Sequence, residues 1–293
     1  MMKKMTGIFP ALVTPYDSQG KLDTDRVQAL VERLQKQGVS GFYVGGSTGE
    51  SYLLRMDERK KMLEAVKEAA DPDLDIIANI GMLATEQSVE LAEHAQKAGV
   101  SAISSVPPFY FSFTMEEYYR YYEDLADSVD VPVLIYNIPA MSGVSFSTEN
   151  LERFLSNEKI LGLKHTSYDL FQLQRLIQLY PDKTMFAGHD ELFLSALSVG
   201  VRAGIGSTFN VMAGKFIEMI RMFEEKRMED ALKIQGEVNA VVEVLCKVGV
   251  FKGVKEILKL QGMDCGDCRK PFEPLDENAK KMVAEAAEKY GLT

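Results

Sequence analysis

The stretch KILGLKHTSYDLFQLQRLIQLYP, residues 159–181, contains one complete strand–helix unit. It begins with a continuous apolar run, which is typical of a parallel strand that is covered on both faces. A helix is predicted from residue 169 onward. The apolar run also contains Lys164, although lysine is among the residues that are least often buried. The unit indicates how the chain folds, and the lysine within it needs an explanation.

The same order of strand and helix is repeated along the chain. Strands are predicted at 7–15, 41–46, 75–81, 101–108, 131–139, 159–167, 184–190 and 203–210. Each is followed by a predicted helix, at 24–38, 56–70, 85–99, 114–129, 147–156, 169–181, 191–200 and 213–227. Eight such units close naturally into a (β/α)8 TIM barrel, whereas a doubly wound open sheet usually has fewer strands.

Three more helices are predicted after the last unit, at 231–249, 251–262 and 277–291. No flexible linker or low-complexity segment separates them from the preceding part of the chain. We therefore predict an α/β fold in a single domain over residues 1–293, with a barrel at 1–227 and a C-terminal helical appendage at 228–293.

The composition is that of a globular protein with an ample core, since 46% of the 293 residues are hydrophobic and 26% are charged. The formal net charge of −10 argues against nucleic acid or an anionic membrane as a partner, because both need a basic face. An anionic small substrate stays possible, because backbone N–H groups can bind it. No apolar run approaches the ~20 residues of a membrane span. Without a signal-type cleavage pattern, a cytoplasmic location is expected.

The sequence does not favour a metal site. The cysteines are Cys246, Cys265 and Cys268, and the histidines are His94, His165 and His189. The C-x-x-C pair in DCGDC lacks a second pair of ligands and lacks the preceding strand of a thioredoxin-like unit. No histidine has a carboxylate or cysteine partner at convincing metal-ligand spacing. We expect the C-x-x-C pair to be two reduced thiols in a loop. We also expect that none of the three histidines binds a metal.

Active sites of (β/α)8 barrels lie at the carboxyl ends of the strands, so the polar residues there are candidates. GGSTGE, residues 45–50, brings backbone N–H groups and the hydroxyls of Ser47 and Thr48, although a simple glycine-rich turn would read the same way. Tyr136 ends the fifth strand and could equally be a core tyrosine. Asp190 and Glu191 begin the seventh helix, where they either complement the helix dipole or bind a polyol.

Lys164 is the most unusual of these residues. Its stem could be buried while its ammonium reaches solvent. Lys247 and Lys259 have equally apolar neighbours, but both lie near the end of a predicted helix, where a cation complements the dipole. Burial lowers the pKa of a lysine and makes a neutral amine available, which can attack a ketone to form a Schiff base. With Tyr136 as a proton relay, this arrangement predicts retro-aldol chemistry.

At these residues the sequence resembles the pyruvate-dependent class I aldolase family of N-acetylneuraminate lyase and dihydrodipicolinate synthase. The resemblance runs from GIFPALVTP to CRKPFEP, and its marks are GGSTGE, PPFYF, YNIPAMSG, GLKHTS, AGHDE and GIGSTFN. It implies a (β/α)8 barrel with three trailing helices, a homotetramer, and neither a metal nor an organic cofactor.

The resemblance also implies roles for single residues. Lys164 matches the Schiff-base lysine, Tyr136 the proton-relay tyrosine, and Ser47 and Thr48 the hydroxyls that hold the keto-acid carboxylate. Tyr110 matches a tyrosine that reaches the site of a neighbouring subunit. The positions that match the sugar-binding residues of the sialic acid lyases are Thr166, Gly188, Asp190, Glu191, Gly206 and Ser207.

Met141 discriminates between substrates within the family. Dihydrodipicolinate synthases usually carry an arginine at this place to bind a carboxylate, and a methionine offers no such donors. An uncharged aldehyde such as an amino sugar is then expected, and with it reversible cleavage of N-acetylneuraminate to pyruvate and N-acetylmannosamine. His189 departs from the tyrosine that can occupy its place in sialic acid lyases. The alternatives are a 2-keto-3-deoxy sugar acid aldolase, a dihydrodipicolinate synthase, and a non-catalytic keto-acid or sugar-acid binding protein.

Overall fold

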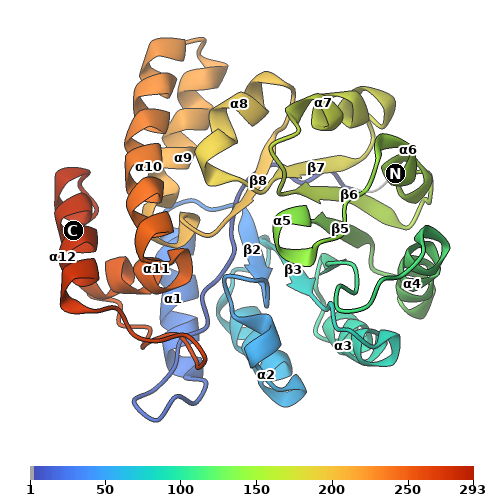
Figure 1. Ribbon diagram of the computed structural model, residues 1–293, viewed down its shortest axis with the longest axis horizontal. Coiled ribbons are helices and arrows are strands. Elements are labelled where there is room, and N and C mark those ends of the chain that lie inside the picture. Colours follow the sequence, from blue (N-terminus) through green and yellow to red (C-terminus); the bar gives the residue numbers. More distant parts are fainter. Residues whose placement is uncertain (1–2) are drawn as a thin grey trace. The chain divides into compact units, whose positions relative to one another are not determined.

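In a computed structural model of the protein, which describes residues 3–293, eight strands belong to one sheet (Figure 1). They are β1 (Gly7–Pro10), β2 (Gly41–Val44), β3 (Asp75–Asn79), β4 (Ala102–Ser105), β5 (Val133–Asn137), β6 (Ile160–His165), β7 (Thr184–Ala187) and β8 (Ala203–Gly206). Their order in the sheet is β1-β8-β7-β6-β5-β4-β3-β2. Together with the helices between them, this is the topology of a (β/α)8 barrel, so the predicted fold class is confirmed.

The chain forms two compact units. The first comprises residues 3–6 and Asp75–Gly204, and the second comprises Gly7–Leu74 and Ile205–Thr293. Neither unit coincides with the predicted division at residue 227, and the single-domain organisation stays a prediction.

In the first unit, helices alternate with strands that pair in parallel from β3 to β8. The helices are α3 (Thr85–Lys97), α4 (Met115–Ser128), α5 (Pro139–Ser142), α6 (Thr148–Leu155), α7 (Leu170–Leu179) and α8 (Phe193–Ser198), with the short 3-10 turn η2 (Asp190–Leu192) before α8. Figure 1 shows α3, α4, α6 and α7 around the outside of β3–β7. The sequence did not predict α5, which is only 4 residues long. It predicted one continuous helix from residue 191, where the structure has the η2 turn followed by α8.

Helix α4 illustrates how the sequence forms these elements. Thr114 and Glu117 make a capping box at its start, with each side chain bonded to the other's backbone N–H. Tyr121 and Tyr122 point to the core, where they bury large rings and still satisfy their hydroxyls. The Tyr121 hydroxyl lies 2.7 Å from Ser105 Oγ, and the Tyr122 hydroxyl donates to the Ser105 carbonyl oxygen at 2.9 Å. The helix is thereby tied to the end of β4.

A register shift in β6 decides which side chains share a face with β5. Val133 on β5 pairs with Ile160, but Leu134 pairs with Gly162, so β6 contains one extra residue at this point. As a result, Tyr136 pairs with Lys164. Without the shift the same tyrosine would pair with Leu163, and Lys164 would project from the opposite face, because side chains alternate along a strand.

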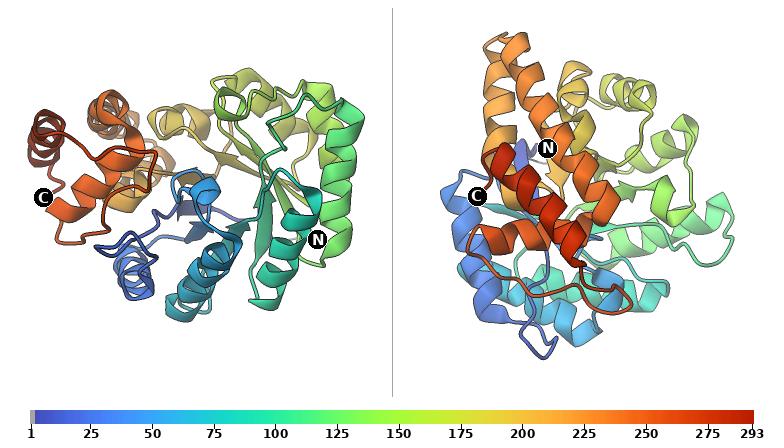
Figure 2. Two further views of the ribbon diagram at one scale, coloured as in Figure 1. Left: turned by 60° about the horizontal axis from the view of Figure 1, so that its bottom comes forward. Right: turned by 60° about the vertical axis from the view of Figure 1, so that its left-hand side comes forward.

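The second unit contains β1, β2 and the remaining helices. These are α1 (Thr24–Lys36), α2 (Met56–Ala69), α9 (Phe209–Glu224), α10 (Met228–Val248), α11 (Val250–Leu260) and α12 (Glu277–Lys289), with the 3-10 turn η1 (Ser51–Leu53) before α2. The three trailing helices that the sequence predicts are α10, α11 and α12, and Figure 2 shows them packed together at the C-terminal end of the chain. No helix within residues 3–293 is long and apolar enough to span a lipid bilayer.

Candidate active site

Lys164 and Tyr136 lie side by side near the carboxyl ends of β6 and β5. Their side chains are buried, with exposed fractions of 4% for Lys164 and 3% for Tyr136. The Lys164 Nζ lies 3.8 Å from the centroid of the Tyr136 ring. The structure therefore places the predicted lysine away from bulk water and against the predicted tyrosine, at the end of the barrel where chemistry takes place.

Lys183 and Lys255 are also buried, but neither lies at the carboxyl end of a strand. Lys183 Nζ donates to the backbone carbonyl oxygens of Asn157 at 2.9 Å and Ile160 at 2.7 Å, which lie at the opposite end of β6 from Lys164. Burial lowers the pKa of Lys183, but these carbonyls occupy its ammonium. Lys255 is paired with Glu50 at 2.9 Å. The sequence indicates the burial of neither lysine, because both become buried through contacts with residues distant in sequence.

Thr166 and Gly188, two predicted sugar-binding residues, are neighbours. A Cβ at Gly188 would lie 1.9 Å from Thr166 Oγ1, so only glycine permits this approach. The buried Thr166 Oγ1 makes no hydrogen bond with any group in residues 3–293. A buried hydroxyl without a partner is costly in a folded protein, and a polyol ligand can supply the missing hydrogen bond.

Glu191 and His189, which follow β7, form a polar and aromatic cluster with Tyr168, which follows β6. His189 Nδ1 lies 3.0 Å from Glu191 Oε1, and the Tyr168 hydroxyl donates to the same oxygen at 3.4 Å. Burial alone would raise the pKa of Glu191, but the hydrogen bond from His189 holds it below its ordinary value. The Tyr168 ring stacks on His189 with centroids 4.5 Å apart, although Tyr168 is 70% exposed. The sequence singled out Glu191 and His189 but missed Tyr168.

Asp190, the other predicted carboxylate in this region, is buried and begins η2.

His165 follows Lys164 on β6, so its side chain lies on the opposite face of the strand. Its imidazole lies between the Asn137 side chain, at 3.4 Å, and the Asp169 carbonyl oxygen, at 3.0 Å. Burial lowers the pKa of His165 to about 4, so the neutral ring joins β5 and β6 to the start of α7.

In the second unit, Thr48 and Ser207 come together although they are far apart in sequence. Thr48 Oγ1 and Ser207 Oγ lie 2.7 Å apart. Gly206 accepts a hydrogen bond at its carbonyl oxygen from the Ala11 N–H at 2.9 Å, which joins β8 to the end of β1. Ser47 precedes Thr48 in a tight turn and is half-buried. The GGSTGE turn and the GIGSTFN segment thus present hydroxyls at one place within this unit.

Tyr110 and Met141 are exposed residues of the first unit. Tyr110 is 74% exposed and contacts Phe111 edge to face, with ring centroids 5.0 Å apart. Its predicted reach into a neighbouring subunit stays a prediction. Met141 lies in α5, two residues after the start of this helix at Pro139, with its side chain exposed.

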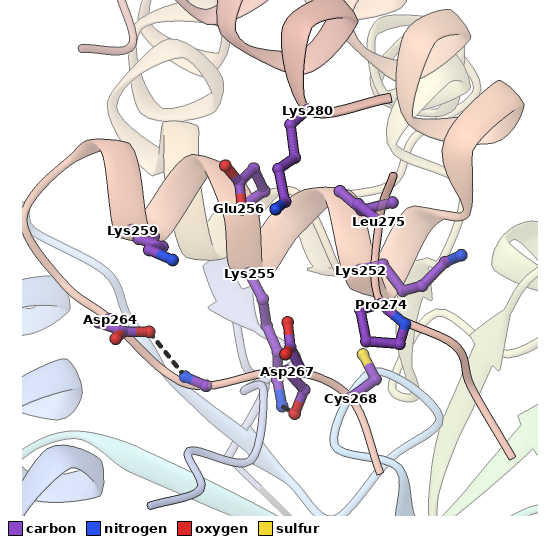
Figure 3. Close-up of a pocket in the computed structure, with 11 residues that line it drawn as sticks. Lys252, Lys255, Glu256, Lys259, Asp264, Asp267, Cys268, Pro274, Leu275 and Lys280 are labelled. Carbon is purple, nitrogen blue, oxygen red and sulfur yellow. Dashed lines mark hydrogen bonds between the residues drawn. The ribbon is translucent and has the colours of Figure 1, made fainter. Parts of the chain in front are cut away.

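The cysteines are free thiols, and a metal-ligand cluster is not found in the described part of the chain. Burial raises the pKa of Cys265 and of Cys268 to about 12 each, so both thiols are protonated at neutral pH. Within residues 3–293, no group of three or more His, Cys, Asp or Glu side chains is placed to hold a metal ion. Cys268 lines a cavity of about 130 Å³ beneath α11 (Figure 3).

Comparisons with known proteins agree over nearly the whole chain. An N-acetylneuraminate lyase of Citrobacter koseri is 39% identical over 279 residues, which cover 94% of this chain and 94% of the relative. The structure of CdNal from Clostridium difficile in complex with mannosamine has a TM-score of 0.95 and 34% identity, covering 98% of this chain and 100% of that chain. N-acetylneuraminate lyase from Fusobacterium nucleatum complexed with pyruvate has a TM-score of 0.92 and 34% identity, covering 98% and 97%. The sequence model of the Dihydrodipicolinate synthetase family matches residues 4–290, and the chain therefore belongs to this family.

Proposed function

We propose that this protein is a Schiff-base aldolase that cleaves N-acetylneuraminate reversibly to pyruvate and N-acetylmannosamine. The observation that carries the proposal is the buried pair of Lys164 and Tyr136, in register on neighbouring strands with the lysine Nζ 3.8 Å from the ring centroid. The relatives named N-acetylneuraminate lyase, and the neighbours solved with mannosamine and with pyruvate, support this choice of substrate and products.

Lys164 acts as the nucleophile. Its amine attacks the C2 ketone of the open-chain sugar acid, and the resulting carbinolamine takes up a proton and loses water to give a protonated imine. As the C3–C4 bond breaks, its electron pair moves toward the imine nitrogen and leaves an enamine. Tyr136 relays the proton away from the C4 hydroxyl, and that hydroxyl becomes the aldehyde of N-acetylmannosamine. Protonation of the enamine at C3 and hydrolysis of the imine then release pyruvate and restore the lysine.

The remaining predicted residues bind the two ends of the substrate. Family resemblance assigns the keto-acid carboxylate to the hydroxyls of Ser47 and Thr48. For the sugar chain, the unpartnered Thr166 Oγ1 and the carboxylates of Asp190 and Glu191 offer hydrogen-bonding groups. Tyr168 adds an aromatic surface next to Glu191, through its stacking on His189.

The oligomeric state and the location belong to the same proposal. Resemblance to the family supports a homotetramer in which Tyr110, exposed in the single chain, reaches the site of a neighbouring subunit. The cytoplasmic location expected from the sequence stays a prediction.

A substrate panel tests the proposed reaction. The purified protein is incubated separately with N-acetylneuraminate and with a 2-keto-3-deoxy sugar acid, and pyruvate and the aldehyde product are measured by mass. In the synthetic direction, pyruvate is offered with N-acetylmannosamine or with aspartate semialdehyde. We expect efficient turnover of N-acetylneuraminate and of N-acetylmannosamine. Preference for either competing substrate would reassign the substrate, and absence of turnover with every substrate would favour a binding protein.

A further candidate is the dihydrodipicolinate synthase reaction, because the family description names this enzyme. Met141 argues against it, since an exposed thioether cannot replace the paired donors that an arginine offers to a carboxylate. Turnover of aspartate semialdehyde in the panel would contradict this interpretation of Met141.

A further inference from the structure

A buried ion pair at the end of the GGSTGE motif joins two distant parts of the second unit. Glu50 and Lys255 lie 2.9 Å apart, and their side chains are 0% and 3% exposed. Lys255 extends from α11 toward the loop that follows this helix, where its Nζ donates to the Asp267 carbonyl oxygen at 3.2 Å (Figure 3). The Glu50–Lys255 contact is mainly electrostatic, because Glu50 Oε1 accepts no well-directed hydrogen bond within residues 3–293.

The other oxygen of Glu50 is held by the loop at residues 262–270. The Arg269 backbone N–H donates to Glu50 Oε2 at 2.6 Å. The Arg269 guanidinium then forms two hydrogen bonds to the Glu58 carboxylate, at 2.8 and 2.9 Å, and a third to the Leu53 carbonyl oxygen at 3.0 Å. Burial and the nearby charge of Glu50 raise the pKa of Cys268 to about 12, so its thiol stays protonated beside the carboxylate. The loop therefore binds both ends of the stretch from Glu50 to Glu58.

Tyr16 completes this packing. Its ring centroid lies 4.3 Å from Lys255 Nζ and 4.6 Å from the Arg269 guanidinium carbon, so both cations contact the same aromatic ring. The Tyr16 N–H donates to the Cys265 carbonyl oxygen at 3.0 Å. Gly266 approaches Tyr16 so closely that a Cβ would lie 2.7 Å from the Tyr16 carbonyl oxygen. The DCGDC segment thus has a packing role that its thiols do not explain.

The conformation of Glu50 connects this cluster to Ser47 and Thr48. Glu50 has a φ of +56°, in the left-handed region that residues with a Cβ seldom adopt. Its N–H donates to the Ser47 carbonyl oxygen at 3.0 Å and closes the turn at residues 47–50, which has Thr48 and Gly49 at its centre. The Gly49 carbonyl oxygen accepts from Thr14 Oγ1 at 2.6 Å, which holds the same turn from its other side.

We propose that Glu50 and Lys255 are positioning residues for the turn at residues 47–50. Their buried ion pair holds Glu50 in the left-handed conformation, and the turn then keeps the Ser47 and Thr48 hydroxyls in place for the substrate carboxylate. This inference rests on the proposed function for the identity of the ligand. The appended helices thereby contribute to substrate binding through Lys255 of α11.

The test uses three variants of the full-length protein: Lys255→Met, Glu50→Gln, and the double variant. A single substitution leaves one buried charge without its partner, whereas the double variant removes both charges and retains similar shapes. The matched control is Lys247→Met, which breaks the exposed Lys247–Glu243 ion pair of α10. Two quantities are measured well below the melting temperature of every variant: hydrogen–deuterium exchange of the peptide that covers residues 45–51, and half-saturation by pyruvate in borohydride trapping.

We expect faster exchange of residues 45–51 in both single variants, and a half-saturating pyruvate concentration raised on the order of tenfold, because a small misplacement of binding groups is costly. The double variant should return toward the wild type in both quantities, and Lys247→Met should change neither. Lower melting temperatures with unchanged exchange and unchanged half-saturation would overturn the inference and leave the pair a merely structural role. If the single variants exchange faster but the wild-type protein traps no pyruvate, the ion pair does hold the turn at residues 47–50, and the proposed function is overturned.

Discussion

A Cβ atom at Gly162 on β6 would lie 1.8 Å from the carbonyl oxygen of Thr184 on β7. Gly162 is also the residue at which β6 shifts register against β5. The close approach to β7 and the extra residue in β6 occur together, and they allow Lys164 to pair with Tyr136. The position of the proposed nucleophile therefore depends on a glycine two residues before it.

Gly162→Ala should destabilise the protein by about 1–3 kcal/mol or more, because the added methyl group must displace β7 backbone. It should also lower the yield of the pyruvate adduct on Lys164, since the register of β6 changes. Urea unfolding and borohydride trapping measure the two effects. Gly236→Ala in α10 is the control, because its Cβ meets nothing within 4 Å, and it should leave trapping unchanged. Wild-type stability in Gly162→Ala would contradict the steric argument.

Tyr168→Ala should raise the KM for N-acetylneuraminate several-fold and leave the trapping of pyruvate unchanged. The ring stacks on His189 and donates to Glu191, so its loss affects the region proposed to bind the sugar chain but not the lysine. Steady-state kinetics and trapping are compared on the same preparation. Phe171→Ala, which removes another exposed aromatic side chain, is the control. An equal loss of pyruvate trapping in Tyr168→Ala would show that the ring supports the whole site.

Stability should fall between pH 6.5 and pH 4 because of His165. Its pKa is lowered from 6.5 to about 4 in the folded protein, so the unfolded chain binds a proton in this range that the native protein does not. The contribution is fully present above pH 6.5 and is lost as the pH falls to about 4, with a limit of roughly 3 kcal/mol. Chemical denaturation at several pH values measures the slope.

His165→Gln should flatten this pH dependence, whatever its effect at neutral pH. His94→Gln is the matched histidine control and should keep the slope of the wild type. An unchanged slope in His165→Gln would assign the acid sensitivity to other groups.

The three thiols should react in two classes. Cys246 is exposed, whereas burial raises the pKa of Cys265 and Cys268 to about 12 and keeps them protonated. Iodoacetamide at neutral pH should therefore label Cys246 in the native protein, and the other two only after denaturation. Peptide mass spectrometry identifies the labelled sites. Rapid native labelling of Cys268, which is half-buried, would contradict the raised pKa of its thiol beside Glu50.

The sequence predicts the eight strands, the helices that follow them and the burial of Lys164, because each depends on a local pattern. The apolar run before Lys164 predicts β6, and the eightfold repetition predicts the barrel. The register shift at Gly162 is different, because register is a property of two strands together and no single run contains it.

The features that the sequence missed arise from contacts between distant residues. Arg269 and Glu50 bond across 219 residues of chain, and nothing near either residue indicates its partner. Tyr168 was missed because an exposed aromatic residue in a loop has no periodic pattern. Its relevance appears only when its ring is found against His189.

The most direct measurement of the central claim is borohydride reduction in the presence of pyruvate, followed by peptide mass mapping. We predict one reduced adduct per chain, on Lys164, and no adduct in a folded Lys164→Met variant. The buried Lys183 and Lys255 serve as internal controls, because their ammonium groups are already bonded to carbonyl oxygens or to Glu50. Absence of an adduct on the wild-type protein, or an adduct on another lysine, would contradict the account.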